Sequence, residues 1–521
     1  REQYFLAGRK LTWWLIGFSL IASNISTEHF VGMTGNAAKS GMAVASYEWL
    51  AVPALVLVAW WFLPTFLRAG IYTVPEFLEE RYDRTTRSIL AGLMVVFFVL
   101  TVLATVLYGG AIFLVSVFDI DQHMIEWWGL TPEAAESWAF FSCVWLIGIG
   151  AGIYTITGGL TAVVWSDLLQ GAALLLGGLL VFILALLALG DGEGMWAGWS
   201  NFTEANADKL HVVRPWNDPD IPSLSLMTGL WIPVLFYWGL NQFIVQRTFA
   251  AGSLKEGQKG VLFAAALKLA LPFIVVIPGM MAVQILGDGF SADNADAAYP
   301  DLLQELLPAG LLGLMLAAVA GAVLSSFNSG LNSAATVFTL DLWGTHVEPG
   351  MSDGRAVRIG RISTTVLAIA ACIWAPVIHS FDGVFNYIQE IWGFVSAPTF
   401  SIFVAGLLLP RVPAGAAKAS LIVGPVLYLL SRVPSWTLDP ATLDGGFMES
   451  LHSYSSMAFL YHMFIIFILL MVMQWAWSVI RPAEPKPLPD HRVVDMTPWG
   501  GLVPASVLLL LFVGGLYILF W

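Results

Sequence analysis

Long apolar runs separated by short polar connections dominate this chain. Residues 89–118, 168–189, 261–286 and 459–480 each form a run longer than the ~20 residues that a helix needs to cross a bilayer. The pattern predicts about thirteen spans, near residues 11–37, 45–67, 88–118, 137–158, 161–189, 223–248, 258–286, 303–340, 357–379, 383–409, 417–432, 455–480 and 498–521. We therefore expect an all-α membrane protein that forms one transmembrane domain over residues 1–521.

Basic residues gather in alternate connections between these spans. The connection after the second span holds Arg81, Arg84 and Arg87, whereas the intervening connections are acidic, as in 119–136 and 288–305. Because cytoplasmic loops carry an excess of Lys and Arg, we expect the residues near Arg1 to be cytoplasmic and the C-terminus to lie outside a plasma membrane. The chain starts at Arg1 without a Met, so we expect a preceding segment that holds one more helix.

The composition agrees with a lipid environment and argues against several partners. The chain is 58% hydrophobic and 11% charged, with a net charge of −13, whereas soluble domains carry roughly 25% charged residues. This composition indicates that the bilayer is a partner. No segment clusters Lys and Arg with aromatic residues, so we expect no nucleic acid as a partner. We see no soluble domain, metal cluster or nucleotide motif, and therefore expect no enzyme. The two cysteines, Cys143 and Cys372, fall inside predicted spans, so there is no disulfide framework.

Two spans contain helix-breaking chemistry at membrane depth. The first is interrupted by the polar stretch 22–29, and the sixth has Pro233 followed by 236–239. Unwound backbone survives in a membrane only where protein buries it or where it lines a cavity. Breaks five helices apart are typical of transporters with inverted repeats and a site at the midplane. We predict repeats over 11–189 and 223–409 with peripheral helices over 417–521; ordinary kinked helices are the alternative.

Four ionisable residues lie inside predicted spans: Glu28, His29, Glu48 and Lys268. Such groups are costly in a membrane and are functional candidates by default. The simpler alternatives are a structural ion pair for Lys268, a solvated helix cap for Glu48 and a buried, hydrogen-bonded histidine for His29. Glu28 points about 100° away from His29 on a regular helix, so we expect it to serve packing or gating.

The eighth span has a stripe of small and hydroxyl residues on one helical face: Ala322, Ser325, Ser326, Ser329 and Ser333. Close helix packing accounts for such stripes in many membrane proteins. The functional interpretation is a sodium site, because a small hard cation prefers several oxygen ligands. The candidate ligands are the carbonyls of Ala22, Ile25 and Ala322 and the hydroxyls of Ser325 and Ser326.

Several motifs are shared with a known family. They are residues 23–32 at the first break, 45–49, 70–77, 157–160, 242–247, and Ser325-Ser326 followed by 332–336. Over essentially the whole chain the sequence resembles the solute:sodium symporter family, and within it the sodium/glucose and sodium/galactose cotransporters. The resemblance implies fourteen helices, a five-plus-five inverted repeat with broken first and sixth helices, and sodium bound by the five candidate ligands above.

The resemblance also implies a sugar site. His29, Glu48, Lys268 and Gln389 would bond the sugar hydroxyls, Tyr237 would stack beneath the ring as inner gate, and Trp238, Phe385 and Met33 would complete the apolar walls. Two positions depart from a bacterial galactose carrier: His29 replaces an amide and Val234 replaces an asparagine. Asp167 and Ser329 stand where some members bind a second ion, but the neighbouring Asn328 replaces a hydroxyl. We therefore expect one sodium per sugar, with Asp167 on the ion's exit route or serving as a structural anchor.

The physical chemistry of a sugar agrees with this prediction. A sugar has polar edges and an apolar face, so its site needs polar groups around the rim and an aromatic platform. Lys268 and Glu48 could share one near-neutral site, whereas an anionic solute favours a basic excess. We predict sodium-coupled uptake of galactose or glucose by alternating access. The alternatives are sodium symport of myo-inositol, sialic acid or an amino acid, and, from another functional class, a passive channel.

Overall fold

The computed structural model describes residues 6–26, 28–290, 292–381, 384–440, 446–486, 490–491 and 493–521. Within these ranges it leaves out the side chains of residues 154, 156–163, 166–167, 288, 292–294 and 385–386. The described residues are almost entirely helical, and they contain isolated bridges such as Leu11–Ala251 but no sheet.

The first half of the chain is built around a broken helix. The elements are α2 (Trp13–Asn24), π-helix η2 (Glu28–Met33), α3 (Thr34–Ser40), η3 (Gly41–Ala45), α4 (Ser46–Trp49), α5 (Ala51–Leu57), η4 (Val58–Phe62), α6 (Leu63–Ala69), α7 (Val74–Arg81), α8 (Arg84–Phe97), η5 (Phe98–Leu103), α9 (Ala104–Phe118), α10 (Ile120–Trp128), α11 (Pro132–Leu189) and α12 (Met195–Ala205). A short 3-10 turn, η1 (Ala7–Arg9), precedes α2.

A second broken helix opens the other half. The elements are α13 (Trp231–Leu240), α14 (Gln242–Phe249), α15 (Leu254–Ile274), α16 (Val276–Leu286), α17 (Ala298–Leu306), α18 (Ala309–Val337), η10 (Phe338–Val347), α19 (Asp353–Trp374), α20 (Val384–Leu408), α21 (Ala414–Thr437), α22 (Phe447–Ser455), α23 (Phe459–Ile480) and α24 (Leu502–Leu519). Short 3-10 turns occupy Ala207–Lys209, Ser223–Met227, Gly287–Gly289, Ala292–Ala297 and Ala375–Ser380.

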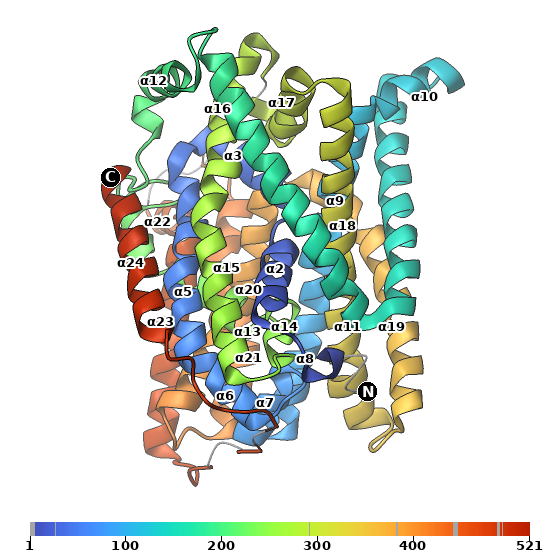
Figure 1. Cartoon of the computed structure of the whole chain (residues 1–521). Helices are drawn as coiled ribbons and strands as arrows, with labels where there is room; N and C mark the ends of the chain where they lie inside the picture. The colour runs from blue at the N-terminus through green and yellow to red at the C-terminus, as the bar shows by residue number, and fades with distance from the viewer. Residues whose placement is uncertain are drawn as a thin grey trace.

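The predicted spans are found in the structure with two adjustments. Among the described residues, 12 helical stretches are long and apolar enough to cross a membrane. The first predicted span is not one of these by itself, because it is divided between α2, η2 and α3. The spans predicted at 137–158 and 161–189 belong to one helix, α11, which descends along one edge of the molecule, bends sharply and climbs again (Figure 1).

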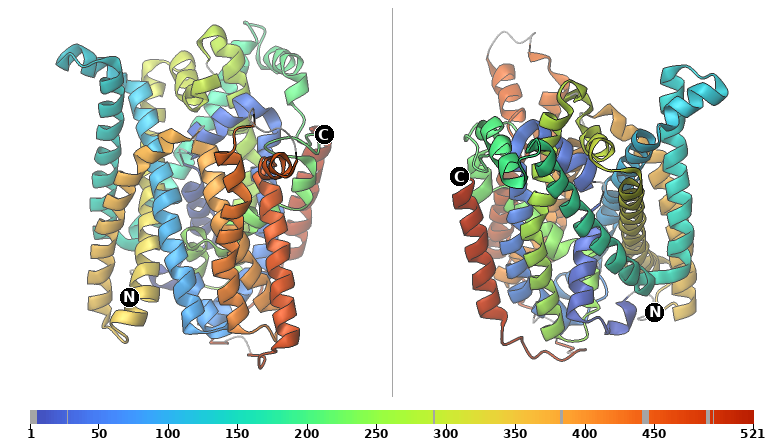
Figure 2. Two further views of the ribbon diagram at one scale, coloured as in Figure 1. Left: turned by 180° about the vertical axis from the view of Figure 1, so that it is seen from behind. Right: turned by 45° about the horizontal axis from the view of Figure 1, so that its top comes forward.

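The broken helices lie at the centre of the bundle, and the last helices lie at its edge. Figure 1 shows α2 between α15 and α11, with α13, α14 and α20 behind it, while α24 lies at one side, as it does in both views of Figure 2. We call the face that holds α6, α7 and the chain start the N-terminal face; α10, α12 and α17 lie at the opposite face. This arrangement buries the two breaks deep inside protein, where unwound backbone is tolerated.

The start of α8 at the N-terminal face is fixed by Asp83. Its carboxylate accepts from the backbone N–H and hydroxyl of Thr86 at 2.8 and 2.9 Å, and from Lys418 Nζ at 2.9 Å. Burial alone would raise the pKa of Asp83, but the hydrogen bonds from Thr86 and the ion pair with Lys418 outweigh it and lower this pKa. The charged cap therefore ties α8 to α21 at neutral pH.

Candidate functional site

Each central break frees backbone groups at the middle of the bundle. Ile25 is extended and its N–H makes the last bond of α2, to Ile21. Asn241 is also extended and separates α13 from α14, where its side chain accepts from Phe243 N–H at 3.2 Å, as an Asn N-cap does. A helix end leaves its last carbonyls without partners inside the helix, so both breaks present oxygens to their surroundings.

The break in the sixth predicted span occurs later than we expected. Pro233 lies in the first turn of α13. In a first turn the proline ring meets no carbonyl of a preceding helical turn, and the N–H that proline lacks would make no bond within the helix. Helical structure continues through the aromatic stretch 236–239 and ends at Leu240. The interruption is therefore a capping asparagine rather than a proline kink.

A pocket lies between the two breaks. It is lined by Asn24, Glu28, His29, Met33, Tyr47, Glu48, Pro233, Val234, Tyr237, Trp238, Lys268, Ile388, Gln389 and Trp392. The pocket therefore combines charged groups, amides and aromatic rings from both halves of the chain.

A buried ion pair forms the polar wall of the pocket. Lys268 on α15 is 1% exposed, and its ammonium donates to Glu48 Oε2 on α4 and to Asn24 Oδ1 at the end of α2. His29 Nε2 lies 3.3 Å from Glu48 Oε1. The described residues offer no hydrogen-bond partner for His29 Nδ1. This wall therefore has polar atoms available for a ligand.

Aromatic rings form the floor. The ring of Tyr237 stacks on Trp392 with centroids 5.0 Å apart and planes 20° from parallel. Its hydroxyl accepts from Asn24 Nδ2 at 3.0 Å, so the ring is held by both broken segments. Trp238 lies beneath Lys268 Nζ at 5.0 Å from the ring centroid, within the range of a cation–π contact.

A second, hydroxyl-rich cavity of about 340 Å³ lies on the other side of Tyr237. Its polar lining includes Ser23, Ser26, Thr101, Thr105 and Ser326, and it shares Asn24, Glu28, Tyr237, Ile388 and Trp392 with the first pocket. The two cavities are thus separated only by the aromatic floor and the first break.

One of the five predicted sodium ligands, Ser326, lines this second cavity. Ala22, Ile25, Ala322, Ser325 and Ser326 are all buried, and the Ser326 hydroxyl approaches the Ser23 carbonyl at 3.5 Å. The hydroxyl stripe of α18 therefore faces the frayed end of α2, the arrangement that a shared cation needs. Sodium ligation by these groups stays a prediction.

The neighbouring residues that we weighed for a second ion have other contacts. The buried guanidinium of Arg247 donates to Ser329 Oγ at 2.6 Å and to Ser19 Oγ at 2.7 Å. Asn328 Oδ1 accepts from Thr155 Oγ1 at 2.5 Å. The side chain of Asp167 lies outside the described part of the structure.

The structure brings most of the predicted solute residues to one pocket. His29, Met33, Glu48, Tyr237, Trp238, Lys268 and Gln389 all line it. The side chain of Phe385 lies outside the described part of the structure. The roles of these residues in binding stay predictions.

Sequence reasoning did not assign seven of the lining residues to the pocket, among them Asn24, Glu28 and Trp392. Asn24 was visible as part of the polar break, and Trp392 follows Gln389 by three positions on α20, which places both on one helical face. Glu28 was expected to serve packing or gating because a regular helix turns it away from His29. The segment is a π-helix instead, and Glu28 and His29 both line the pocket.

A further open cavity, which we call the vestibule, shares one lining residue with the pocket. Gln389 lines both spaces, and Asp220, Glu390 and Arg432 lie in the vestibule wall. Arg432 pairs with Glu390 through two nitrogens, one of them Nε at 3.2 Å. Gln389 thus stands between the pocket and the vestibule.

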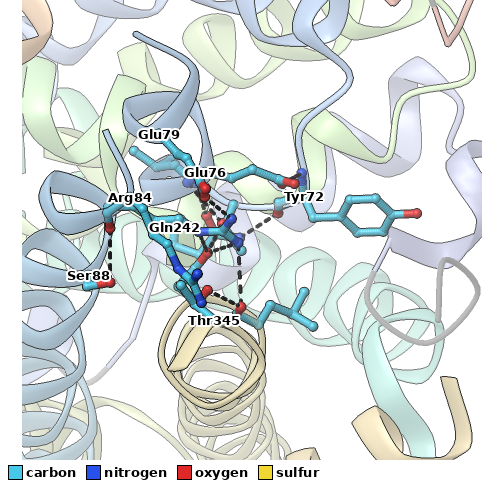
Figure 3. A network of polar contacts seen from close by, with 12 residues as sticks. Tyr72, Glu76, Glu79, Arg84, Ser88, Gln242 and Thr345 are labelled. Atoms are coloured by element: carbon cyan, nitrogen blue, oxygen red, sulfur yellow. Dashed lines mark hydrogen bonds and ion pairs between the residues drawn. The ribbon is translucent and has the colours of Figure 1, made fainter. Parts of the chain in front are cut away.

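A polar network closes the N-terminal face (Figure 3). Asp341 of η10, the continuation of α18, is fully buried and accepts from Thr73 Oγ1 at 2.8 Å and Arg87 Nε at 2.7 Å. Arg87 also pairs with Glu79 at 2.6 Å. Gln242, labelled in Figure 3, joins the network to the start of α14 through Tyr72 and Val74 backbone groups, at 3.1 and 2.9 Å. The network therefore connects α7 and α8 to α14 and η10.

The comparisons with known proteins agree with this architecture. The model of the sodium:solute symporter family matches residues 4–424. The chain belongs to the sodium:solute symporter family. A sodium/glucose cotransporter of Vibrio parahaemolyticus is 39% identical over 83% of this chain and 80% of its own length. An uncharacterized symporter of Escherichia coli, YidK, is 34% identical over 99% of the chain and 86% of its own length.

Two further proteins similar to this chain are named for other solutes. A pig sodium/myo-inositol cotransporter 2 is 34% identical over 82% of the chain, which spans 65% of that longer protein. A sodium-coupled sialic acid symporter, solved in a substrate-bound outward-open state, is 22% identical and aligns over 94% of this chain and 93% of its own with a TM-score of 0.74. That likeness shows the shared fold. The protein is thus a multi-pass membrane symporter with sodium as its coupling ion, and the predicted fold class is confirmed.

Proposed function

We propose that this symporter takes up a neutral monosaccharide, galactose or glucose, together with sodium. The observation that carries the proposal is the pocket between the two breaks, where polar groups face an aromatic floor. Glu48, Lys268, His29 and Gln389 supply acceptors and donors for hydroxyl groups, and Tyr237 supplies a flat apolar surface. The 39% identity to a sodium/glucose cotransporter supports the same solute class.

The charge of the pocket favours a solute without a negative charge. The ammonium of Lys268 is already neutralised by Glu48, and Glu28 adds a second carboxylate. Either carboxylate would repel an anionic solute, which argues against sialic acid. A cyclic polyol such as myo-inositol has the same hydroxyl chemistry and is the second candidate, supported by the relatives named for that solute.

Coupling follows from the position of the sodium residues in this proposal. Sodium bound by the Ala22, Ile25 and Ala322 carbonyls and the Ser325 and Ser326 hydroxyls would hold the end of α2 against α18. The first break carries both this ion site and Asn24, which holds Tyr237 and Lys268. Filling the ion site would therefore order the solute pocket, so each ligand raises the affinity for the other.

Alternating access would then use the two ends of the pocket. Solute would arrive through the vestibule past Gln389 and leave past Tyr237 once the network at the N-terminal face opens. The basic connections at that face, among them Arg81, Arg84 and Arg87, support a cytoplasmic location by the positive-inside rule. The residues near Arg1 would then be cytoplasmic and the C-terminus outside.

Uptake by purified protein in sealed liposomes tests the proposal. Labelled galactose, glucose, myo-inositol, sialic acid and proline are compared under an inward sodium gradient, with choline as the replacement cation. We expect concentrative, sodium-dependent uptake of a hexose, accelerated by an inside-negative potential because net charge moves inward. Gln389→Ala should cripple uptake, whereas Gln474→Ala, at a buried glutamine of the peripheral α23, should not. Concentrative uptake in choline would refute sodium coupling, and uptake of none of the polyhydroxyl solutes would refute the pocket assignment.

A further inference from the structure

Glu28 differs from Glu48 and Lys268 because, among the described residues, its carboxylate accepts no hydrogen bond and forms no close ion pair. It lines both the solute pocket and the hydroxyl-rich cavity, at the junction of the two. Its backbone N–H donates to Ser26 Oγ at 3.2 Å, but among the described residues no side chain or backbone group bonds or pairs with its carboxylate. An ionised carboxylate deep in a membrane protein needs a donor or a cation. The missing partner is therefore expected from the ligand side.

The neighbouring charges cannot supply that partner. Lys268 is committed to Glu48 and Asn24, and Glu48 also lies against His29. The other titratable groups that line the pocket are the phenols of Tyr47 and Tyr237, and the Tyr237 hydroxyl is held by Asn24. Among the described residues that line this pocket, the carboxylates of Glu28 and Glu48 face one ammonium group, that of Lys268. Glu28 is thus the carboxylate that has no ammonium group paired with it.

We infer that Glu28 is a specificity residue that selects solutes carrying hydrogen-bond donors or a positive charge, so that a protonated amino sugar binds more tightly than its neutral or N-acetylated counterpart. The inference rests on the proposed function, since it takes the pocket to be a monosaccharide site. An ammonium group in place of one hydroxyl would pair with the Glu28 carboxylate. Acetylation removes that charge and adds bulk, and a sugar carboxylate would place a third negative group in the same space.

The expected preference is large enough to measure. A hydrogen bond between charged partners is stronger than one between neutral partners, by an amount that corresponds to about tenfold in affinity. Glucosamine should therefore compete for the site at about one tenth of the glucose concentration. Glucuronate should compete at least about tenfold less well than glucose.

The test compares inhibition constants for sodium-driven hexose uptake in proteoliposomes. The competitors are glucose, glucosamine, N-acetylglucosamine and glucuronate, and the proteins are the wild type, Glu28→Gln and Glu305→Gln. Glu305 is an exposed carboxylate of α17 and serves as the matched control. In Glu28→Gln we expect the advantage of glucosamine over glucose to disappear and glucuronate to compete better relative to glucose. Glu305→Gln should keep the wild-type order.

A second measurement uses the wild type alone, so that the inference does not depend on how well Glu28→Gln folds. The inhibition constant of glucosamine, but not of glucose, should rise as the pH is raised and the amine loses its proton. Hexose uptake with no preference for glucosamine at any pH overturns the inference and leaves the proposed function standing. A preference that survives in a well-folded Glu28→Gln also overturns it, because another residue then selects the amine. Absence of uptake and competition for every sugar instead overturns the proposed function itself.

Discussion

The buried pair of Glu48 and Lys268 allows a double-mutant cycle that separates folding from solute binding. Both side chains are almost fully buried, at 4% and 1% exposure, and they pair directly. Replacing one partner leaves an uncompensated charge in the membrane interior, which costs about 3–5 kcal/mol. Replacing both with neutral groups of similar size is often neutral for stability.

The structure predicts that the two single substitutions differ. In Glu48→Gln the Lys268 ammonium keeps Asn24 Oδ1 as an acceptor, so the loss of stability should be at the lower end, about 3 kcal/mol. In Lys268→Met the Glu48 carboxylate keeps only His29 Nε2 at 3.3 Å and shares the pocket with Glu28, so the loss should approach about 5 kcal/mol. The double variant should recover most of this energy, so the coupling energy should approach the sum of the two single losses, about 8 kcal/mol.

The assay is equilibrium unfolding of purified protein in one detergent, combined with sodium-dependent hexose binding on the same samples. We expect the double variant to be nearly as stable as the wild type and still to bind hexose at least about a hundredfold more weakly, because two polar partners of the solute are gone. Lys255→Met, at an exposed lysine of α15, is the control and should change neither quantity. Additive losses of stability would show that the pair is not coupled, and wild-type hexose affinity in the double variant would remove it from the binding site.

Three further predictions concern the ion site, the floor and the closed face. Ser326→Ala should raise the sodium concentration for half-maximal uptake about tenfold, since one oxygen ligand is lost; a sodium titration of uptake checks this, and Ser420→Ala on the peripheral α21 should leave it unchanged. Tyr237→Phe should keep most of the hexose affinity because the stacking ring remains, whereas Tyr237→Ala should lose it, as measured by equilibrium binding; equal losses would argue against stacking. Asp341→Asn should open the N-terminal face, because it removes one charged partner of the network. A loss of about 3 kcal/mol would shift the equilibrium between the closed and the open face about a hundredfold toward the open one. Thiol labelling of Thr105→Cys from that side should then accelerate, and an unchanged rate would mean that the network does not hold this face closed.

The positions of the breaks could be predicted from sequence because polar side chains are costly at membrane depth and seldom occur there without a function. The stretch 22–29 is interrupted as expected, since Ile25 is extended. The second break was located only approximately, because Pro233 is the conspicuous residue and yet lies in a first helical turn. Asn241 interrupts the helix through its extended backbone and caps α14 with its side chain. In the sequence, an asparagine with these two roles looks the same as any other buried asparagine.

A pocket residue could be predicted from the sequence where its charge makes it conspicuous. It could not be predicted where local helix geometry, or the position of one aromatic residue among many, places it in the pocket. Glu48 and Lys268 stand out because ionisable groups are rare inside spans, and the structure joins them as a pair. Trp392 does not stand out, and only the packing of α13 against α20 places it on Tyr237. Glu28 was assigned by regular helix periodicity, which does not hold in a π-helical segment.

The expected ratio of sodium to sugar depends on the contacts that the residues at the second candidate ion position already make. We expect one sodium per sugar. The fully charged guanidinium of Arg247, 1% exposed, donates to Ser329 Oγ, and Asn328 Oδ1 accepts from Thr155 Oγ1. The oxygens of Ser329 and Asn328, which a second sodium could use, are therefore engaged.

A second cation about 4 Å from the Arg247 guanidinium would meet a repulsion of about 4 kcal/mol at an effective dielectric constant of about 20. That energy corresponds to about a thousandfold in sodium affinity. Charge movement under voltage clamp, compared with labelled sugar uptake in the same sample, gives the ratio directly, and we expect a value near one. A ratio near two that falls to one in Asp167→Asn would instead mean that Asp167 supplies a carboxylate strong enough to overcome this repulsion. Arg247 would then have to move away from Ser329 during transport, because the cation and the guanidinium cannot both use that hydroxyl.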